Sequence, residues 1–315
     1  MTEESKIAQV AAGAERAEEQ RGGPKKSFFI RHRTGLLAAA LLGIPILFWA
    51  VLSAFPLVFG IGLSFFEWTN LTESPVFIGF ENFKSFFTNE YYWMSLVRTV
   101  FIGGLCFVFG TVCGLLLALA VNKLRFLRSF FRSVWYIPCV ASTVAVSQIF
   151  QLLLDYDGIL NSMLIGMGAE PVSWDLEYGW SVFWIVVYST WKGLGGSVLM
   201  WLAALQSVDS TIVEAAELDG AGRTTMFFRI KLPQMMPIVV YILISGVVGA
   251  MQIYEQVQFI TNGGPSGQTA VLAYRIMRLA FWDNNFGMAS CCSVIMMLVT
   301  FVFVVILFRK QKEGA

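Results

Sequence analysis

The chain has 315 residues, of which 57% are hydrophobic and 14% are charged. Soluble domains average roughly 45–50% apolar and about 25% charged residues, so this composition indicates an integral membrane protein. The 22 basic and 21 acidic residues nearly balance, which argues against a nucleic-acid-binding protein, because such proteins carry a basic excess or a basic stripe. The single histidine, His32, lies in a polar N-terminal tail, which nearly excludes catalysis that needs a buried imidazole.

The cysteines predict neither a metal site nor a disulfide framework. All five lie in apolar stretches and lack the spacing of either kind of site. They are Cys106, Cys113, Cys139, Cys291 and Cys292. We therefore expect no bound metal and no cofactor.

Six apolar stretches are long enough to cross a membrane, since a spanning helix needs about 20 mostly apolar residues. They are Leu36 to Phe66, Leu96 to Val121, Val134 to Leu154, Trp180 to Leu205, Ile238 to Ile260, and Gly287 to Phe308. The first contains Pro45 and Pro56, which predict a kink. The sequence therefore divides into a polar tail over residues 1–34, a transmembrane domain over 35–310 and a short tail over 311–315.

The Lys and Arg residues are divided unevenly between the two sides of these spans. Seventeen fall in the N-terminal tail, the second and fourth loops and the C-terminal end. The other five are Lys84, Arg98, Lys192, Arg275 and Arg278. Cytoplasmic loops carry the basic excess, so both termini are predicted to be cytoplasmic, as an even number of spans requires.

The fourth loop, over about 207–237, has the pattern of two short helices joined at a glycine. Thr211 followed by Glu214 is a capping box, which predicts a helix start. Gly220 is suited to the left-handed residue that ends such a helix. A second helix is expected from Thr224 or Thr225 to Ile230, ending before Pro233. From the residues alone, this loop is either a docking element or an amphipathic loop lying on the membrane.

The end of this loop predicts where the fifth span begins. Pro237 sits where a first-turn proline would start that helix.

The same loop resembles the EAA signature of binding-protein-dependent ATP-binding-cassette importer permeases. The residues that carry the resemblance are Glu214-Ala-Ala, Gly220, Ile230 and Leu232-Pro233, in both type and spacing. In that family the loop forms the helices that contact the ATP-hydrolysing subunit. The resemblance therefore implies a coupling role for Glu214, Ala215, Ala216, Asp219, Gly220, Ala221, Arg223, Leu232 and Pro233.

Three further runs are similar to those of carbohydrate-type permeases, in particular the first permease of maltose-type and glycerol-phosphate-type systems. They are Phe77-Ile-Gly-Phe-Glu-Asn-Phe83, Thr261-Asn-Gly-Gly-Pro265 and Gly287-Met-Ala-Ser290. The resemblance implies an all-α membrane protein with the type I importer permease fold and six transmembrane helices, in the bacterial inner membrane. It also implies three kinds of partner: a second permease, which is commonly a different chain, cytoplasmic ATPase subunits, and an extracytoplasmic solute-binding protein that delivers a sugar.

The chain lacks a phosphate-binding loop, because no G-x-x-x-x-G-K-[ST] sequence occurs. ATP hydrolysis is therefore expected on a separate subunit, and the chain itself is not expected to be an enzyme. One alternative is the same family importing glycerol phosphate, a polyol or another small solute. An ion-coupled secondary transporter would need inverted repeats and intramembrane carboxylate relays, and the sequence shows neither.

Polar side chains inside the spans are the candidates for the substrate path, since they are costly to expose to lipid. They are Gln148, Gln151, Lys192, Gln252, Tyr254, Glu255 and Gln258. Gln252, Glu255 and Gln258 follow at three-residue steps and are expected on one side of the fifth helix. The alternative is polar helix packing, worth under about 1 kcal/mol per hydrogen bond.

Lys192, near the middle of the fourth stretch, has two interpretations. It either lines an outer vestibule, pairing with a carboxylate such as Glu255, or extends its ammonium to the membrane surface from a span that starts later.

Overall fold

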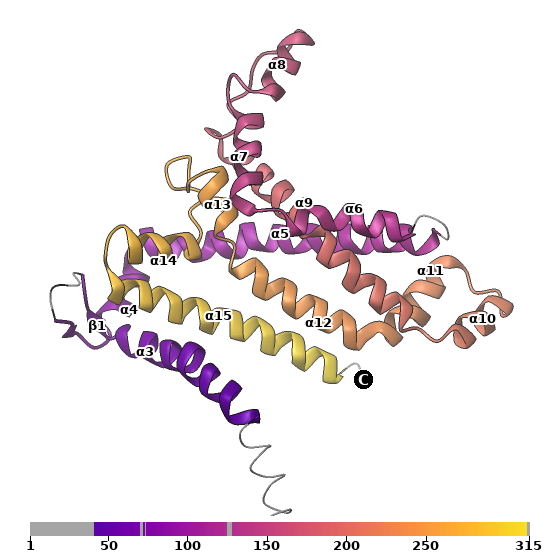
Figure 1. The fold of residues 1–315 in the computed structure, drawn as a ribbon, viewed down its shortest axis with the longest axis horizontal. Coiled ribbons are helices and arrows are strands. Elements are labelled where there is room, and N and C mark those ends of the chain that lie inside the picture. The colour runs from indigo at the N-terminus through magenta and orange to yellow at the C-terminus, as the bar shows by residue number, and fades with distance from the viewer. Residues whose placement is uncertain (1–40, 70–71, 73, 125–127, 314–315) are drawn as a thin grey trace, which may run out of the picture. The chain divides into compact units, whose positions relative to one another are not determined.

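The computed structural model describes residues 41–69, 72, 74–124 and 128–313. The chain forms two compact units, Met1–Phe59 and Gly60–Ala315. The expected tail over residues 1–34 and the first residues of the first span lie outside the described residues. The second unit is a helical bundle with two helices, α7 and α8, projecting from it (Figure 1).

The first span runs from Leu41 to Leu63. Its turn Ala50–Ala54 is a π-helix, η1, and α3 (Phe55–Leu63) continues from it. Phe55 donates its backbone N–H to the carbonyl of Ala50, five residues earlier. Because a proline ring clashes with the carbonyl four residues before it, the wider π-turn gives Pro56 room. At Pro56, where the sequence predicts a kink, the helix therefore has a widened turn.

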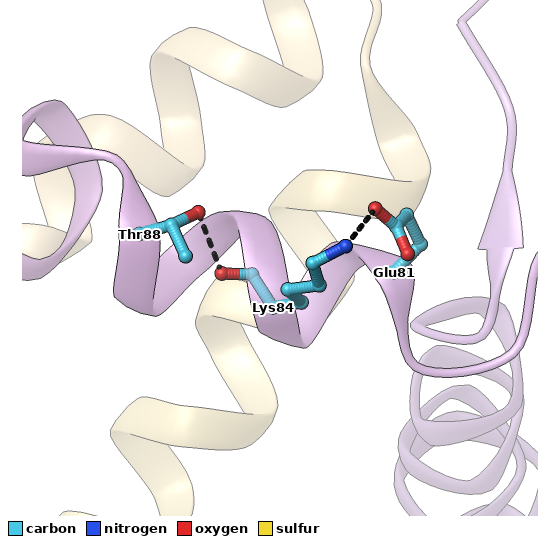
Figure 2. Close-up of polar contacts among 3 residues, drawn as sticks. All are labelled: Glu81, Lys84 and Thr88. Carbon is cyan, nitrogen blue, oxygen red and sulfur yellow. Dashed lines mark hydrogen bonds and ion pairs between the residues drawn. The ribbon is translucent and has the colours of Figure 1, made fainter.

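A short hairpin and a surface helix follow. Strands β1 (Phe66–Glu67) and β2 (Val76–Phe77) pair antiparallel, and α4 spans Glu81–Thr88. In α4, Lys84 Nζ lies 3.2 Å from Glu81 Oε1, and Thr88 Oγ1 donates to the Lys84 carbonyl (Figure 2). Among the described residues this is the one ion pair.

Three long helices form the centre of the bundle: α5 (Glu90–Lys123), α9 (Tyr178–Gln206) and α12 (Leu232–Met251). Close approach depends on small residues, as expected where helices pack in lipid. A Cβ placed on Gly103 of α5 would lie 2.4 Å from the carbonyl oxygen of Ala250 in α12. Trp201, Leu202 and Met235 are buried in one shared cluster. These helices are therefore packed as a single core.

The third span is broken, which the sequence did not predict. It consists of α6 (Arg128–Val140) and α7 (Thr143–Leu154), with α8 (Ile159–Gly166) after a turn. The axis bends by 96° at residues 141–142. Pro138 lies inside α6 and removes one backbone donor shortly before the break. The expected span from Val134 to Leu154 therefore consists of two helices with a break between them.

The fifth span begins earlier and ends earlier than expected. α11 (Arg223–Thr225), the π-helix η2 (Met226–Lys231) and α12 form one continuous helix over Arg223–Met251. After a break, α13 covers Glu255–Ile260. Pro237 lies inside α12 and does not occupy its first turn. Both Pro237 as a helix start and the expected range Ile238 to Ile260 are therefore wrong.

The chain closes with α14 (Leu272–Phe281) and α15 (Phe286–Glu313). α14 packs on α15 and α4 through a buried cluster that includes Phe86, Leu272 and Cys292. Within the described ranges, four helices are individually long and apolar enough to cross a membrane, and two bent helix pairs raise the total to six. One pair is the broken third span, and the other joins α9 to α10 (Ser210–Leu218).

Candidate functional site

The fourth loop begins with a capped helix that turns away from the bundle. α10 is bent by 69° from α9. Asp209, rather than the predicted Thr211, is its N-cap: the Asp209 carboxylate accepts from the Thr211 backbone N–H at 2.9 Å and from its hydroxyl at 2.8 Å. These two bonds lower the pKa of Asp209. The capping box is corrected because Asp209, two residues earlier, offers a stronger, charged acceptor.

The end of α10 is the glycine turn that the sequence predicted. Gly220 has a φ of +77°. Its N–H donates to the Glu217 carbonyl, and the Ala221 N–H donates to the Ala216 carbonyl. This pair of bonds is the Schellman arrangement, which satisfies helix-end carbonyls and requires a left-handed residue. The helix–glycine–helix geometry is thus confirmed.

Between its two caps, α10 contributes no buried residue. Ile212 is 46% exposed and Leu218 is 89% exposed, and Glu214, Ala215 and Asp219 are exposed as well. A soluble helix would bury one apolar stripe against its own fold. We therefore regard α10 as a surface that is complete only with a partner.

The second half of the loop is anchored instead of exposed. Met226 is buried, and Phe227 and Leu232 pack against the cluster around Met235. The Asp209 backbone N–H also reaches Gln234 Oε1 in α12 at 3.3 Å. The start of α10 is therefore tied to α12, so that α10 and the fifth span are mechanically connected.

The helix after Gly222 does not end before Pro233, as the sequence had predicted. It passes through the π-helix η2, in which the Leu232 N–H donates to the Phe227 carbonyl five residues earlier. Pro233 then lies in the first turn of α12, where a missing N–H costs little. Arg223 and Pro233 are exposed, and Leu232 is half-buried.

A cavity of about 350 Å³ lies between α5, α9 and α12. Its wall has glycines from all three helices, including Gly110, Gly193 and Gly246, together with hydroxyl side chains. Thr190 Oγ1 is buried and has no hydrogen-bond partner among the described residues. Polar groups at the wall of this cavity include Thr111, Ser245 and Gln256, which suits a ligand with hydroxyl groups.

The path candidates do not line this cavity; the glutamine that does is Gln256. Sequence reasoning missed the cavity because its wall is mainly glycine, serine and threonine. Their signal is several small residues on the second, fourth and fifth spans, which favours close packing equally well.

The structure separates the candidates that were expected to share a helix face. Gln252 is the C-cap of α12, whereas Glu255 and Gln258 belong to α13, so they do not lie on one helix. Tyr254 is half-buried at the break between the two helices. The pKa of Tyr254 is raised, first by burial and then by Tyr274 and Glu255.

The remaining glutamines lie on the outer elements. Gln151 on α7 donates through Nε2 to the Phe259 carbonyl of α13, and Gln258 Nε2 reaches Asn262 Oδ1 at 3.3 Å. Gln148 is exposed. Gln151 and Gln258 therefore make polar contacts with residues of α13 and of the turn after it.

Lys192 lies in the middle of α9, and its ammonium contacts backbone carbonyls. It is the fifteenth of the 29 residues of α9, about 21 Å along the axis from either end. It forms no ion pair with Glu255 among the described residues. Its Nζ donates to the Ala141 carbonyl at 2.8 Å and lies 3.5 Å from that of Pro138. Lys192 therefore binds the carbonyl end of α6 at the break in the third span.

Comparison with known proteins places this geometry in a family. Residues 110–312, well over half of the chain, match the family described as "Binding-protein-dependent transport system inner membrane component". The lactose transport system permease protein LacF of Rhizobium radiobacter is 30% identical over 244 residues, 75% of this chain and 82% of LacF. The sn-glycerol-3-phosphate transport system permease protein UgpA of Yersinia pestis is 31% identical over 240 residues, 75% and 80% of the two chains.

Two further likenesses cover more of the chain. The multiple sugar-binding transport system permease protein MsmF of Streptococcus mutans is 27% identical over 270 residues, 86% of this chain and 93% of MsmF. A chain in the crystal structure of a bacterial ABC transporter involved in the import of the acidic polysaccharide alginate has a TM-score of 0.77 at 24% identity, covering 90% of this chain and 96% of that one. Residues 110–312, matched by the family, include the fourth loop and the cavity wall apart from Cys106 and Phe107. This chain therefore belongs to the family of inner-membrane permease subunits of binding-protein-dependent transport systems, and it has the type I permease fold.

Proposed function

We propose that this permease carries a sugar or oligosaccharide into the cell, with ATP hydrolysed on a separate subunit. The observation that carries the proposal is the α10–Gly220 element, capped at both ends, without a buried residue, and tied to α12. The names of LacF and MsmF refer to lactose and to multiple sugars, which supports a sugar substrate. The name of UgpA supports the alternative, a glycerol phosphate or a related polyol.

The coupling contact consists of residues from the exposed helix and its glycine turn, with support from the helix that follows. We assign the contact to Glu214, Ala215, Ala216, Asp219, Gly220 and Ala221, and the support to Arg223, Leu232 and Pro233. Movement of the ATPase subunit against α10 reaches α12 through Asp209 and Gln234, whose contact is 3.3 Å. This is a rigid-body change biased by a ligand on one side.

The substrate path includes the cavity between α5, α9 and α12. Gln256 supplies an amide at the wall, and Thr111 and Ser245 supply hydroxyl groups. Gln252, Tyr254 and Glu255 lie at the adjoining break and remain candidates for the outer part of the path, with Gln148, Gln151 and Gln258 beyond them. Lys192 acts on the path indirectly, through the break in the third span.

Membership of the importer permease family supports the other partners. A second permease, a different chain, forms the opposite wall, and an extracytoplasmic binding protein delivers the sugar to the first, third and fifth loops. We divide the chain into a cytoplasmic tail over 1–34, the permease domain over 35–310 and a C-terminal tail over 311–315.

Gly220→Asp tests the coupling role in the reconstituted complex with its binding protein. A Cβ at Gly220 meets nothing within 4 Å, and aspartate tolerates the left-handed conformation better than most residues. The variant therefore folds but places a charge in the partner contact, and we expect ATP hydrolysis without transport. Gly168→Asp is the matched control for folding and assembly alone, because Gly168 also has a positive φ and open space where a Cβ would lie but lies after α8, outside the coupling loop. Normal transport by Gly220→Asp would contradict the assignment.

Gly193→Leu tests the cavity. A Cβ at Gly193 also meets nothing within 4 Å, although the residue lines the cavity, so leucine fills the space without a backbone clash. We expect normal assembly with strongly reduced sugar uptake. Gly104→Leu is the control, since its Cβ is equally free and it does not line the cavity. Equal uptake by the two variants would place the path elsewhere.

A further inference from the structure

The elements α13 and α14 lie at the end of the bundle opposite to the one that carries α10 and α11 (Figure 1). A polar pocket of about 270 Å³ is lined by Gln258, Asn262, Tyr274, Arg278 and Trp282. None of these residues belongs to the coupling element or the cavity, and only Gln258 is also a candidate for the outer substrate path. Small-molecule sites commonly measure about 300–1,000 Å³, so this pocket suits a single sugar ring rather than an oligosaccharide.

The pocket is held in shape by its own hydrogen bonds. The Tyr274 hydroxyl donates to the Asn262 carbonyl at 2.9 Å, and Arg278 Nη1 donates to the Tyr274 hydroxyl at 3.4 Å. Asn262 has a φ of +48°, a left-handed conformation that asparagine tolerates. The amide, hydroxyl and guanidinium groups are therefore positioned before any ligand arrives.

One arginine, Arg278, lines this pocket, and Arg275 precedes it by three residues on the same helix. Of the five basic residues outside the cytoplasmic set, Arg275 and Arg278 lie on α14, and Arg98 lies close enough to act on Arg275 electrostatically. The pKa of Arg275 is lowered, first by burial and then, after opposing effects from Tyr91 and Tyr274, by Arg98 and Arg278. Its guanidinium carbon stands 3.6 Å from the ring centroid of Tyr91.

No carboxylate neutralises this group of arginines among the residues that the structure describes. The ion pair of the described chain is Lys84 with Glu81, in α4. Asp283 raises the pKa of Arg278 only as a minor contribution, after Tyr274, and forms no ion pair with it. Arg275 Nε is buried without a hydrogen-bond partner. Arg278, in contrast, is exposed, so its free N–H donors are available to an incoming anion.

The other lining groups indicate which kind of molecule bears the anionic group. Two side-chain amides and a phenol suit sugar hydroxyls, and Trp282, 61% exposed, offers a flat apolar face to a ring. Guanidinium groups bind carboxylates in a bidentate, charge-assisted arrangement. We propose that this pocket binds one carboxylate-bearing sugar residue, a hexuronate, on the extracytoplasmic face. The inference rests on the proposed function, because it specifies the sugar class that the importer receives.

Saturation-transfer NMR on the complete complex in lipid nanodiscs tests the pocket, without ATP or binding protein. The probes are methyl β-D-glucuronide and methyl β-D-glucoside, which differ in the carboxylate. We expect the glucuronide to half-saturate at a concentration at least about tenfold lower, the ratio that one charge-assisted hydrogen bond provides. Arg278→Gln should remove this difference in binding, and Trp282→Ala should weaken the binding of both probes. Phe281→Ala is the matched control, since Phe281 is 68% exposed and does not line the pocket.

Equal binding of the two probes, or an unchanged glucuronide titration in Arg278→Gln, would overturn the proposal. So would a variant that keeps glucuronide binding but loses the stimulation of ATP hydrolysis by the binding protein, because the arginine would then serve protein docking. Uptake in the Gly193→Leu experiment reports on the proposed transport function separately. Failure of the pocket and failure of the transport assignment are therefore distinguishable.

Discussion

Replacing Lys192 with methionine tests whether its ammonium holds the break in the third span. The last four carbonyls of a helix lack partners in their own helix, and in lipid each such group costs several kcal/mol if unsatisfied. Lys192 donates to two carbonyls at the end of α6, at Ala141 and Pro138. Its positive charge also faces the negative end of the helix dipole.

Two free energies act in opposite directions in Lys192→Met. A lysine at the centre of a spanning helix raises the free energy of insertion by about 2.5–3.5 kcal/mol, so methionine should improve insertion. Removing a hydrogen bond from a charged donor should lower the free energy of unfolding by about 1.5–3 kcal/mol. We therefore expect a variant that inserts at least as well as the wild type but unfolds more easily.

Insertion is measured by glycosylation mapping of the fourth span, and unfolding by steric trapping in bicelles. Lys84→Met is the matched control: it removes a lysine from an exposed ion pair, which is worth only about 0–1 kcal/mol. Lys192→Arg keeps a cationic donor and should recover part of the loss. A Lys192→Met protein with wild-type unfolding would refute the assignment of Lys192 to the broken helix.

Three further predictions concern other parts of the chain. Gly103→Val should destabilise α5 against α12, because even a Cβ would lie 2.4 Å from the Ala250 carbonyl oxygen; thermal unfolding in detergent measures the loss, and an unchanged midpoint would argue against this close approach. Lowering the pH should release the start of α10: the pKa of Asp209 is lowered, so its capping contribution is complete above the unfolded value of about 3.9 and disappears as the pH falls below it. Hydrogen exchange at the Thr211 amide follows this change, and Asp209→Asn should remove the dependence. Cysteines at Gln252, Tyr254 and Glu255 should be protected from thiol reagents by substrate, and uniform reactivity would exclude the α12–α13 break from the path.

Apolar length and the asymmetry of Lys and Arg are sufficient to predict the membrane class and the number of spans. Both properties are sums over many residues, so that one atypical residue does not change the prediction. The Gly220 turn is also predictable, because a left-handed helix end is a local event that depends on one residue. These features depend on the chain near each residue and not on its distant neighbours.

The incorrect predictions concern features that are decided by distant groups or by an unusual local turn. The break at residues 141–142 is stabilised by Lys192, about 50 residues later in the chain. Continuation through Pro233 depends on a widened turn, which is not part of a helix-end pattern. Most of the glutamine candidates were selected because they are polar. The cavity instead exists because glycines on three helices leave space between the backbones.

Each of the two π-turns sets the rotation, about its own axis, of the helix that follows it. η1 ends two residues before Pro56, and η2 ends two residues before Pro233. One residue corresponds to about 100° of rotation about a helix axis, so the width of η2 sets the direction in which the glycine face of α12 points. Removing one residue from η2 would turn that face by about this angle while the coupling surface on α10 stayed in place. The widened turn at η2 is thus the point at which the coupling surface and the cavity are held in rotational register.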